Sequence, residues 1–189
     1  MRGGRDKRRR AQADVAAIRR LLVLAGQPGH NHEVVHLAPV SPWLQDVAAE
    51  HGLDLDGFVH ALGTSAVRHV LIRHGDAERE ARRGHLAVTP ADFENIAEIV
   101  TQPDQVVLGF RNRIGEQVIA STKRLADGTT LVLEEVHRGR KRLALKTMWK
   151  APGAIDASRL HAIPNLNARD VPQDELKIVV RHGAGKVGA

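Results

Sequence analysis

The sequence contains no cysteine and no tyrosine, and aromatic residues make up only 3% of its 189 residues. The absence of cysteine excludes disulfide bonds and thiolate metal sites. The scarcity of aromatic rings excludes extensive base stacking as a way of binding nucleic acid. No apolar run approaches the roughly 20 residues that a transmembrane helix needs. The basic N-terminus is not followed by the apolar stretch of a signal peptide.

Positive charge is what the sequence has in excess. Lysine and arginine number 28 against 22 aspartate and glutamate, which gives a formal net charge of +6. A basic domain favours polyanionic partners, of which nucleic acid is the commonest. Because aromatic residues are few, contacts to phosphates would have to dominate such binding.

The pattern of apolar residues predicts three segments: a basic leader and linker helix at 1–33, an α+β domain at 34–152, and a partly ordered tail at 153–189. Helices are expected over residues 11–25, 43–51, 54–62, 64–75 and 90–102. Ser41-Pro42, and Thr89-Pro90 with Asp92 three residues after the threonine, are the expected cap-and-proline starts of two of them. Period-two alternation predicts strands over 106–110, 117–123, 130–137 and 142–149, with 176–180 as a candidate edge strand. This order predicts helices packed on a four-stranded antiparallel meander.

Several short motifs follow one another between residues 52 and 150. They are His69-x-x-x-Arg73-His74-Gly75, Val88-Thr89-Pro90-Ala-Asp92-Phe93, the Asp127-Gly128 hairpin turn, Glu134-Glu135-Val136 and Thr147-Met148-Trp149-Lys150. In order and spacing they resemble the phage-associated nuclease-like domains of the barnase–EndoU–colicin–RelE group, found at the C-terminal ends of phage head-associated proteins and polymorphic toxins. The resemblance implies metal-independent RNA cleavage by a domain with helices packed on a four-stranded antiparallel sheet.

The helix predicted at 64–75 carries residues suited to that chemistry. Metal-free RNA cleavage needs a base, an acid and cations that stabilise the phosphate, and histidine and arginine suit these roles. His69 and Arg73 are four residues apart and share a helical face. His74 lies about 140° from His69 and follows the apolar stripe. It is either a hydrogen-bonded histidine at the core edge or a catalytic residue that the helix end at Gly75 turns into a cleft.

The predicted sheet supplies further candidates. Alternation places Thr147 with Leu145 and Trp149 on the helix-facing side, where its hydroxyl either contacts a phosphate beside the catalytic histidines or is satisfied by packing. Ser121 and Lys123 share a strand face and form a candidate phosphate-binding pair. The remaining candidate substrate-binding residues are cations that equally suit a solvated surface, namely Lys150, Arg83, Arg138 and Arg140.

The leading hypothesis is therefore a toxin-type endoribonuclease that acts on tRNA or mRNA in the cytoplasm of a target cell. It would arrive there as the C-terminal part of a larger secreted or injected protein. An acidic inhibitor, or immunity protein, would complement the basic charge. No metal or cofactor is predicted. The alternatives are a non-catalytic nucleic-acid-binding module and a structural or packaging accessory of a phage particle.

Overall fold

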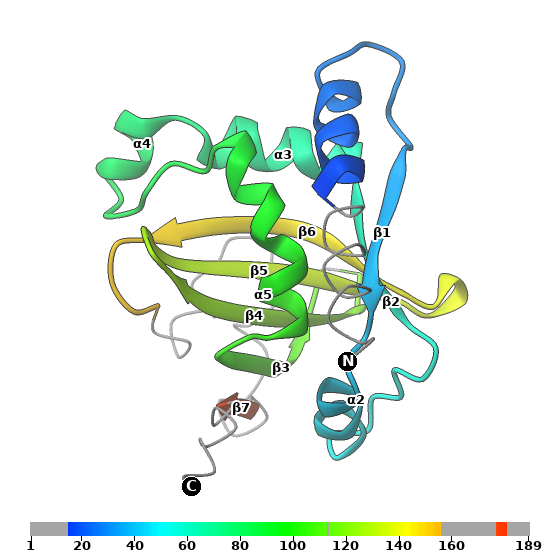
Figure 1. Cartoon of the computed structure of the whole chain (residues 1–189). Helices are drawn as coiled ribbons and strands as arrows, with labels where there is room; N and C mark the ends of the chain where they lie inside the picture. Colours follow the sequence, from blue (N-terminus) through cyan, green and yellow to red (C-terminus); the bar gives the residue numbers. More distant parts are fainter. Residues whose placement is uncertain (1–14, 113, 156–176, 181–189) are drawn as a thin grey trace, which may run out of the picture.

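A seven-stranded sheet forms the centre of the molecule, with strand order β1-β2-β6-β5-β4-β3-β7 (Figure 1). A computed structural model describes residues 15–112, 114–155 and 177–180. The predicted basic run at 2–10 and most of the predicted tail lie outside the described residues. The strands are β1 Val34–Pro39, β2 Val59–Gly63, β3 Gln105–Arg111, β4 Gln117–Leu125, β5 Gly128–His137, β6 Arg142–Ala151 and β7 Lys177–Val180.

The mixed α+β class is confirmed, and the four predicted strands β3 to β6 form an antiparallel meander at the middle of the sheet. The sheet is larger than the four strands predicted, because further strands pair at both of its edges. The candidate strand near the C-terminus pairs with β3 as β7, and two more strands extend the other side. Of these, β1 was not predicted, and β2 runs parallel to β6.

The helix predicted at 54–62 is wrong. Residues 54–58 form a turn in which Gly57 has a φ of +71°, and the chain then enters β2. The middle three residues of β2 are all buried, so its apolar run lacks the alternation that marks a half-exposed strand. A short apolar run of this kind does not distinguish a strand from a helix by its period.

The helices are α2 Pro42–Ala49, α3 Thr64–His74, α4 Ala77–Ala81 and α5 Ile96–Thr101, with 3-10 turns at Pro90–Asn95 and Arg138–Arg140. Ser41 caps α2, as predicted, since its Oγ accepts a hydrogen bond from the Leu44 amide at 3.3 Å. The predicted start at Thr89 is confirmed as a capping box with Asp92. It opens a 3-10 turn that continues into α5, which crosses one face of the sheet (Figure 1).

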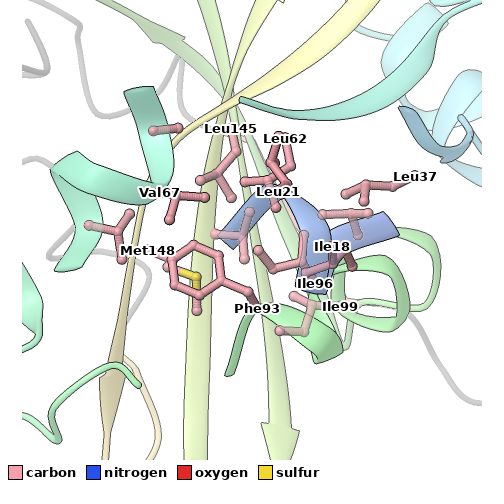
Figure 2. Close-up of a cluster of buried hydrophobic side chains, with 14 of the residues drawn as sticks. Ile18, Leu21, Leu37, Leu62, Val67, Phe93, Ile96, Ile99, Leu145 and Met148 are labelled. Carbon is pink, nitrogen blue, oxygen red and sulfur yellow. The ribbon is translucent and has the colours of Figure 1, made fainter. Parts of the chain in front are cut away.

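The main core lies between that face and the helices. Figure 2 shows apolar side chains from several elements converging around Phe93, which is fully buried. Ile18 and Leu21 in the helical residues 15–25 belong to this cluster. Arg68 of α3 donates hydrogen bonds to the carbonyl oxygens of Ala25, Gln27 and His30. The helical residues 15–25 are therefore part of the same core as the sheet.

A β-bulge in β6 decides which side chains face which side. The register pairs Leu133 with Thr147 and Glu134 with Leu145, so that Lys146 is the extra residue. A one-residue shift reverses the faces of a strand. As a result, Leu145 faces α5, whereas Thr147 and Trp149 face the opposite side.

Candidate active site

A surface pocket of about 270 Å³ lies on the sheet face opposite α5, beside the first turns of α3. This volume is near the lower end of the range for small-ligand sites, about 300–1,000 Å³. The side chains that give it chemical character come from α3, β5 and β6: His69, Glu135, His137, Arg142 and Lys146. We refer to these five residues as the pocket cluster.

His69 is the predicted catalytic residue that the pocket contains. It is partly buried and makes no hydrogen bond with any described residue, so its ring nitrogens are available to a ligand. Burial lowers the pKa of His69 below its ordinary value of 6.5, and the nearby charges of Arg73, His74 and Lys146 lower it further. The imidazole is therefore neutral at neutral pH, the state in which it can accept a proton.

Glu135 and His137 lie two residues apart on the same face of β5, since alternate residues of a strand point to the same side. Glu135 accepts a hydrogen bond from Asn112 Nδ2 at 2.9 Å and lies 3.2 Å from Lys146 Nζ. Burial opposes ionisation of Glu135, but the Asn112 hydrogen bond and the Lys146 charge together keep its pKa below 4.5. The pocket thus holds an ionised carboxylate, with His137 Nε2 3.7 Å from its Oε2.

Arg142 supplies a cation that has no anionic partner among the residues described. It pairs with His137 across β5 and β6, and its Nε is buried without a hydrogen-bond acceptor in the described chain. An unmatched guanidinium group in a pocket is suited to binding the oxygens of a phosphate. The pocket therefore combines a neutral imidazole, a second imidazole, a carboxylate and two cations.

A second group of titratable residues surrounds Glu80, at the other end of α3. Glu80 is fully buried and accepts hydrogen bonds from His74 Nδ1 at 3.1 Å, His85 Nδ1 at 3.3 Å and Arg83 Nη1 at 2.9 Å. The His74 ring also packs against Trp149, with centroids 6.2 Å apart. We call Glu80, His74, Arg83 and His85 the Glu80 cluster. Its hydrogen bonds agree with the interpretation of His74 as a histidine at the core edge.

Glu80 was not among the predicted site residues, although it binds two of them, His74 and Arg83. Burial alone would raise the pKa of Glu80, but the hydrogen bonds from His74 and His85 and the charge of Arg83 hold it below 4.5. Burial also lowers the pKa of His74 from 6.5, against the raising effect of Glu80. The side chains of His74 and Arg83 are thus committed to an interaction within the protein.

Lys150, a predicted substrate-binding residue, is almost completely buried. Its ammonium group donates hydrogen bonds to Asp92 Oδ1 and Asp127 Oδ2, both at 2.6 Å. It thereby joins the capping box before α5 to the hairpin turn between β4 and β5. This arrangement favours a structural role over the predicted contact with RNA.

The other predicted sheet residues also lie away from the pocket. Ser121 is fully buried on the α5 side of the sheet, and Lys123 donates to the Gln102 carbonyl oxygen at 2.7 Å. The predicted common face of Thr147 and Leu145 is wrong, because the bulge at Lys146 leaves Leu145 on the α5 side and places Thr147 on the opposite face with Trp149. There its hydroxyl is buried without a hydrogen-bond partner among the described residues.

The predicted arginines differ in how they relate to the pocket. Arg73 is exposed on α3 and acts on His69 through its charge. Arg138 and Arg140 are exposed in the turn between His137 and Arg142, two residues that line the pocket. Arg138 donates a 2.6 Å hydrogen bond to Gln117 Oε1. These two arginines are therefore placed to extend a positively charged surface from one end of the pocket.

The pocket cluster contains four residues that were not among the predicted site residues. The alternation of β5 put Glu135 and His137 on one face, which was the available signal for that pair. The sequence showed Arg142 as a cation beside a predicted turn and Lys146 as a cation within a predicted strand. Their convergence with His69 depends on the bulge in β6 and on the parallel pairing of β2 with β6.

The chain belongs to the family described as phage-Barnase-EndoU-ColicinE5/D-RelE like nuclease 3, which matches residues 39–158, more than half of its length. This match confirms the family resemblance found in the sequence and supports a toxin-type nuclease. No curated protein and no solved structure matches the chain significantly. Among the described helices, none has the length and apolarity required to cross a bilayer.

Proposed function

We propose that this protein is a metal-independent endoribonuclease and that the pocket cluster is its active site. The observation that carries the proposal is the position of the unpartnered Arg142 Nε in the same pocket as His69, Glu135 and His137. A guanidinium group without an anionic partner can bind a phosphodiester, and the two neighbouring imidazoles can transfer the protons that its cleavage requires.

In the proposed reaction, His69 takes the proton from a ribose 2′-hydroxyl, and O2′ attacks the adjacent phosphorus. The bond from phosphorus to O5′ breaks, and His137 gives a proton to the departing O5′. The products are a 2′,3′-cyclic phosphate and a free 5′-hydroxyl. Arg142 and Lys146 bind the phosphate oxygens as negative charge develops. Glu135 holds Lys146 and positions His137.

RNA is the proposed substrate because the only nucleophile in this reaction is the 2′-hydroxyl of the ribose. The 2′-hydroxyl is within the substrate, so the protein has to supply only proton transfer and positive charge. DNA lacks this hydroxyl. The net charge of +6 and the exposed Arg138 and Arg140 support binding along a phosphate backbone. Cellular tRNA or mRNA in a target cell, and an acidic inhibitor that covers the pocket, belong to the same proposal.

The test uses two oligonucleotides of one sequence, incubated with the purified protein in EDTA. One is all-ribose, and the other carries 2′-deoxyribose at each position. The proposal expects cleavage of the first with cyclic-phosphate ends and no cleavage of the second. Equal cleavage of both would contradict it. Salt-dependent binding of both without cleavage would favour a nucleic-acid-binding module, and no binding would favour a phage structural accessory.

A further inference from the structure

Glu116, Glu135 and His137 bring three possible metal ligands together at one end of the pocket. One carboxylate oxygen from each glutamate and a ring nitrogen of His137 all lie within 4.8 Å of one another. We propose that these three residues bind a first-row transition-metal dication, for which Zn²⁺ is the probe, and that the bound metal inhibits the nuclease. The inhibitory part rests on the proposed function, whereas the binding part does not.

Two of the ligands lie on β5, and the third lies at the start of the neighbouring strand. Glu135 and His137 share a face of β5, and Glu116 directly precedes β4, whose Val118 pairs with Glu135. His137 Nε2 and Glu135 Oε2 are 3.7 Å apart. Ligands that lie about 2.0–2.2 Å from a tetrahedral zinc are separated by roughly 3.3–3.6 Å, so these two atoms need to move little.

A buried asparagine holds the two carboxylates toward each other. Asn112 Nδ2 donates to Glu116 Oε2 at 3.0 Å and to Glu135 Oε1 at 2.9 Å. Its Oδ1 accepts hydrogen bonds from the backbone amides of Ile114 and Glu116, which fixes the orientation of the side-chain amide. Supporting hydrogen bonds of this kind orient carboxylates in metal sites.

This convergence places two like charges beside one imidazole, an arrangement that a cation stabilises. Lys146 provides part of the compensation, at 3.2 Å from Glu135, but its side chain is 55% exposed and free to turn toward solvent. A dication would compensate both carboxylates at once. The His137 ligand favours zinc and related metals over Mg²⁺ and Ca²⁺, which prefer sets of oxygen ligands.

The metal and the substrate would compete for the same groups. Glu135 and His137 belong to the pocket cluster, whereas Glu116 does not line the pocket. A metal held by the three residues removes the His137 nitrogen that gives its proton to O5′. Glu116 therefore offers a way to remove the metal site while leaving the proposed catalytic residues in place.

The binding test is calorimetric titration of metal-free protein with ZnCl₂ near neutral pH, in parallel for wild type, Glu116→Gln and His137→Ala. We expect one zinc site in wild type and an affinity at least tenfold weaker in both variants. The glutamine oxygen still accepts the Asn112 hydrogen bond, so Glu116→Gln should retain the native circular dichroism spectrum. Glu98→Gln, at an exposed acidic residue of α5, is the matched control and should bind as wild type does. Equal zinc affinity in wild type and Glu116→Gln would overturn the site.

The inhibition test measures RNA cleavage with and without added ZnCl₂. Zinc should inhibit wild type, while Glu116→Gln should cleave at the basal rate and be at least tenfold less sensitive to the metal. Stimulation of EDTA-treated wild type by zinc would overturn the inhibitory role. If wild type binds zinc through Glu116 and His137 but cleaves no RNA, the proposed function fails and the metal site stands.

Discussion

The pocket cluster and the Glu80 cluster contain the same kinds of residue at the two ends of α3, yet they differ in how fully their groups are paired. Glu80 is completely buried, and three cationic or imidazole groups bind its carboxylate. In the pocket, His69 makes no hydrogen bond with the described residues and Arg142 Nε has no acceptor among them. Residue type alone therefore does not locate the chemistry, because the Glu80 cluster uses its groups to hold the fold.

Loss of the pocket arginine should reduce catalysis strongly. Arg142→Ala should lower kcat by about 10²–10³-fold, because it removes a donor that stabilises charge on the phosphate. Single-turnover cleavage of an all-ribose oligonucleotide in EDTA measures this loss. Arg124→Ala, at a cation on the far end of the sheet, is the matched control. Equal rates for Arg142→Ala and wild type would show that the Arg142 guanidinium does not bind the scissile phosphate.

The next effect is on stability, and it belongs to the Glu80 cluster. Glu80→Gln should lower the free energy of unfolding by about 1.5–3 kcal/mol, because hydrogen bonds from charged donors to a buried carboxylate are lost. Urea unfolding measures the change. Glu78→Gln, on the same helix but with a side chain 87% exposed, should leave stability unchanged. A Glu80→Gln variant as stable as the control would contradict the structural role of the cluster.

The same residue gives a dependence of stability on pH. The pKa of Glu80 in the folded protein lies below 4.5, its ordinary value. Its contribution is therefore complete above about pH 4.5 and is lost as the pH falls through the folded pKa. The free energy of unfolding of wild type should fall in this acid range, and Glu80→Gln should weaken that dependence. If the free energy of unfolding fell equally with pH in wild type and Glu80→Gln, Glu80 would not be the source of this dependence.

A smaller effect concerns the pH dependence of cleavage. Because the pKa of His69 is lowered, the acid limb of kcat/KM should lie below pH 6.5. Lys146→Met removes one of the positive charges that lower this pKa, so the limb should move upward toward 6.5. Lys123→Met, on the other face of the sheet, should leave its position unchanged. A limb unmoved by Lys146→Met would argue against His69 as the base.

The smallest effect is expected at Ser121. Its hydroxyl is buried on the α5 side without a described hydrogen-bond partner, so Ser121→Ala should change kcat/KM by less than about twofold. Steady-state cleavage kinetics measure the change. A tenfold loss of kcat/KM without loss of stability would restore the phosphate contact predicted from sequence.

The sequence predicted the local features of the fold well. Alternation along β3 to β6, the Asp127-Gly128 turn and the Thr89–Asp92 capping box are signals that lie within a few residues of one another. The edge strand β1 was missed, and β2 was taken for a helix. The parallel contact between β2 and β6 joins segments about 80 residues apart, and no local pattern records it.

In the candidate site, too, local features were predicted and features that depend on distant contacts were missed. His69 was predicted from helix spacing, a local property. Lys146 joins the pocket because it is the bulged residue of β6, and the same bulge turns Thr147 away from α5. Glu80 was missed because a short helix brings it back onto the end of α3. Each of these features depends on packing between separate elements.

We expect the pocket cluster, and not the Glu80 cluster, to carry out RNA cleavage. The most direct measurement is single-turnover RNA cleavage in EDTA by His69→Ala and His85→Ala, one histidine from each cluster. His69→Ala should slow cleavage by about 10²–10⁴-fold at unchanged stability. His85→Ala should cleave at nearly the wild-type rate, since His74 and Arg83 still bind Glu80. Full activity in His69→Ala together with loss of activity in a folded His85→Ala would show that the pocket cluster is not the active site.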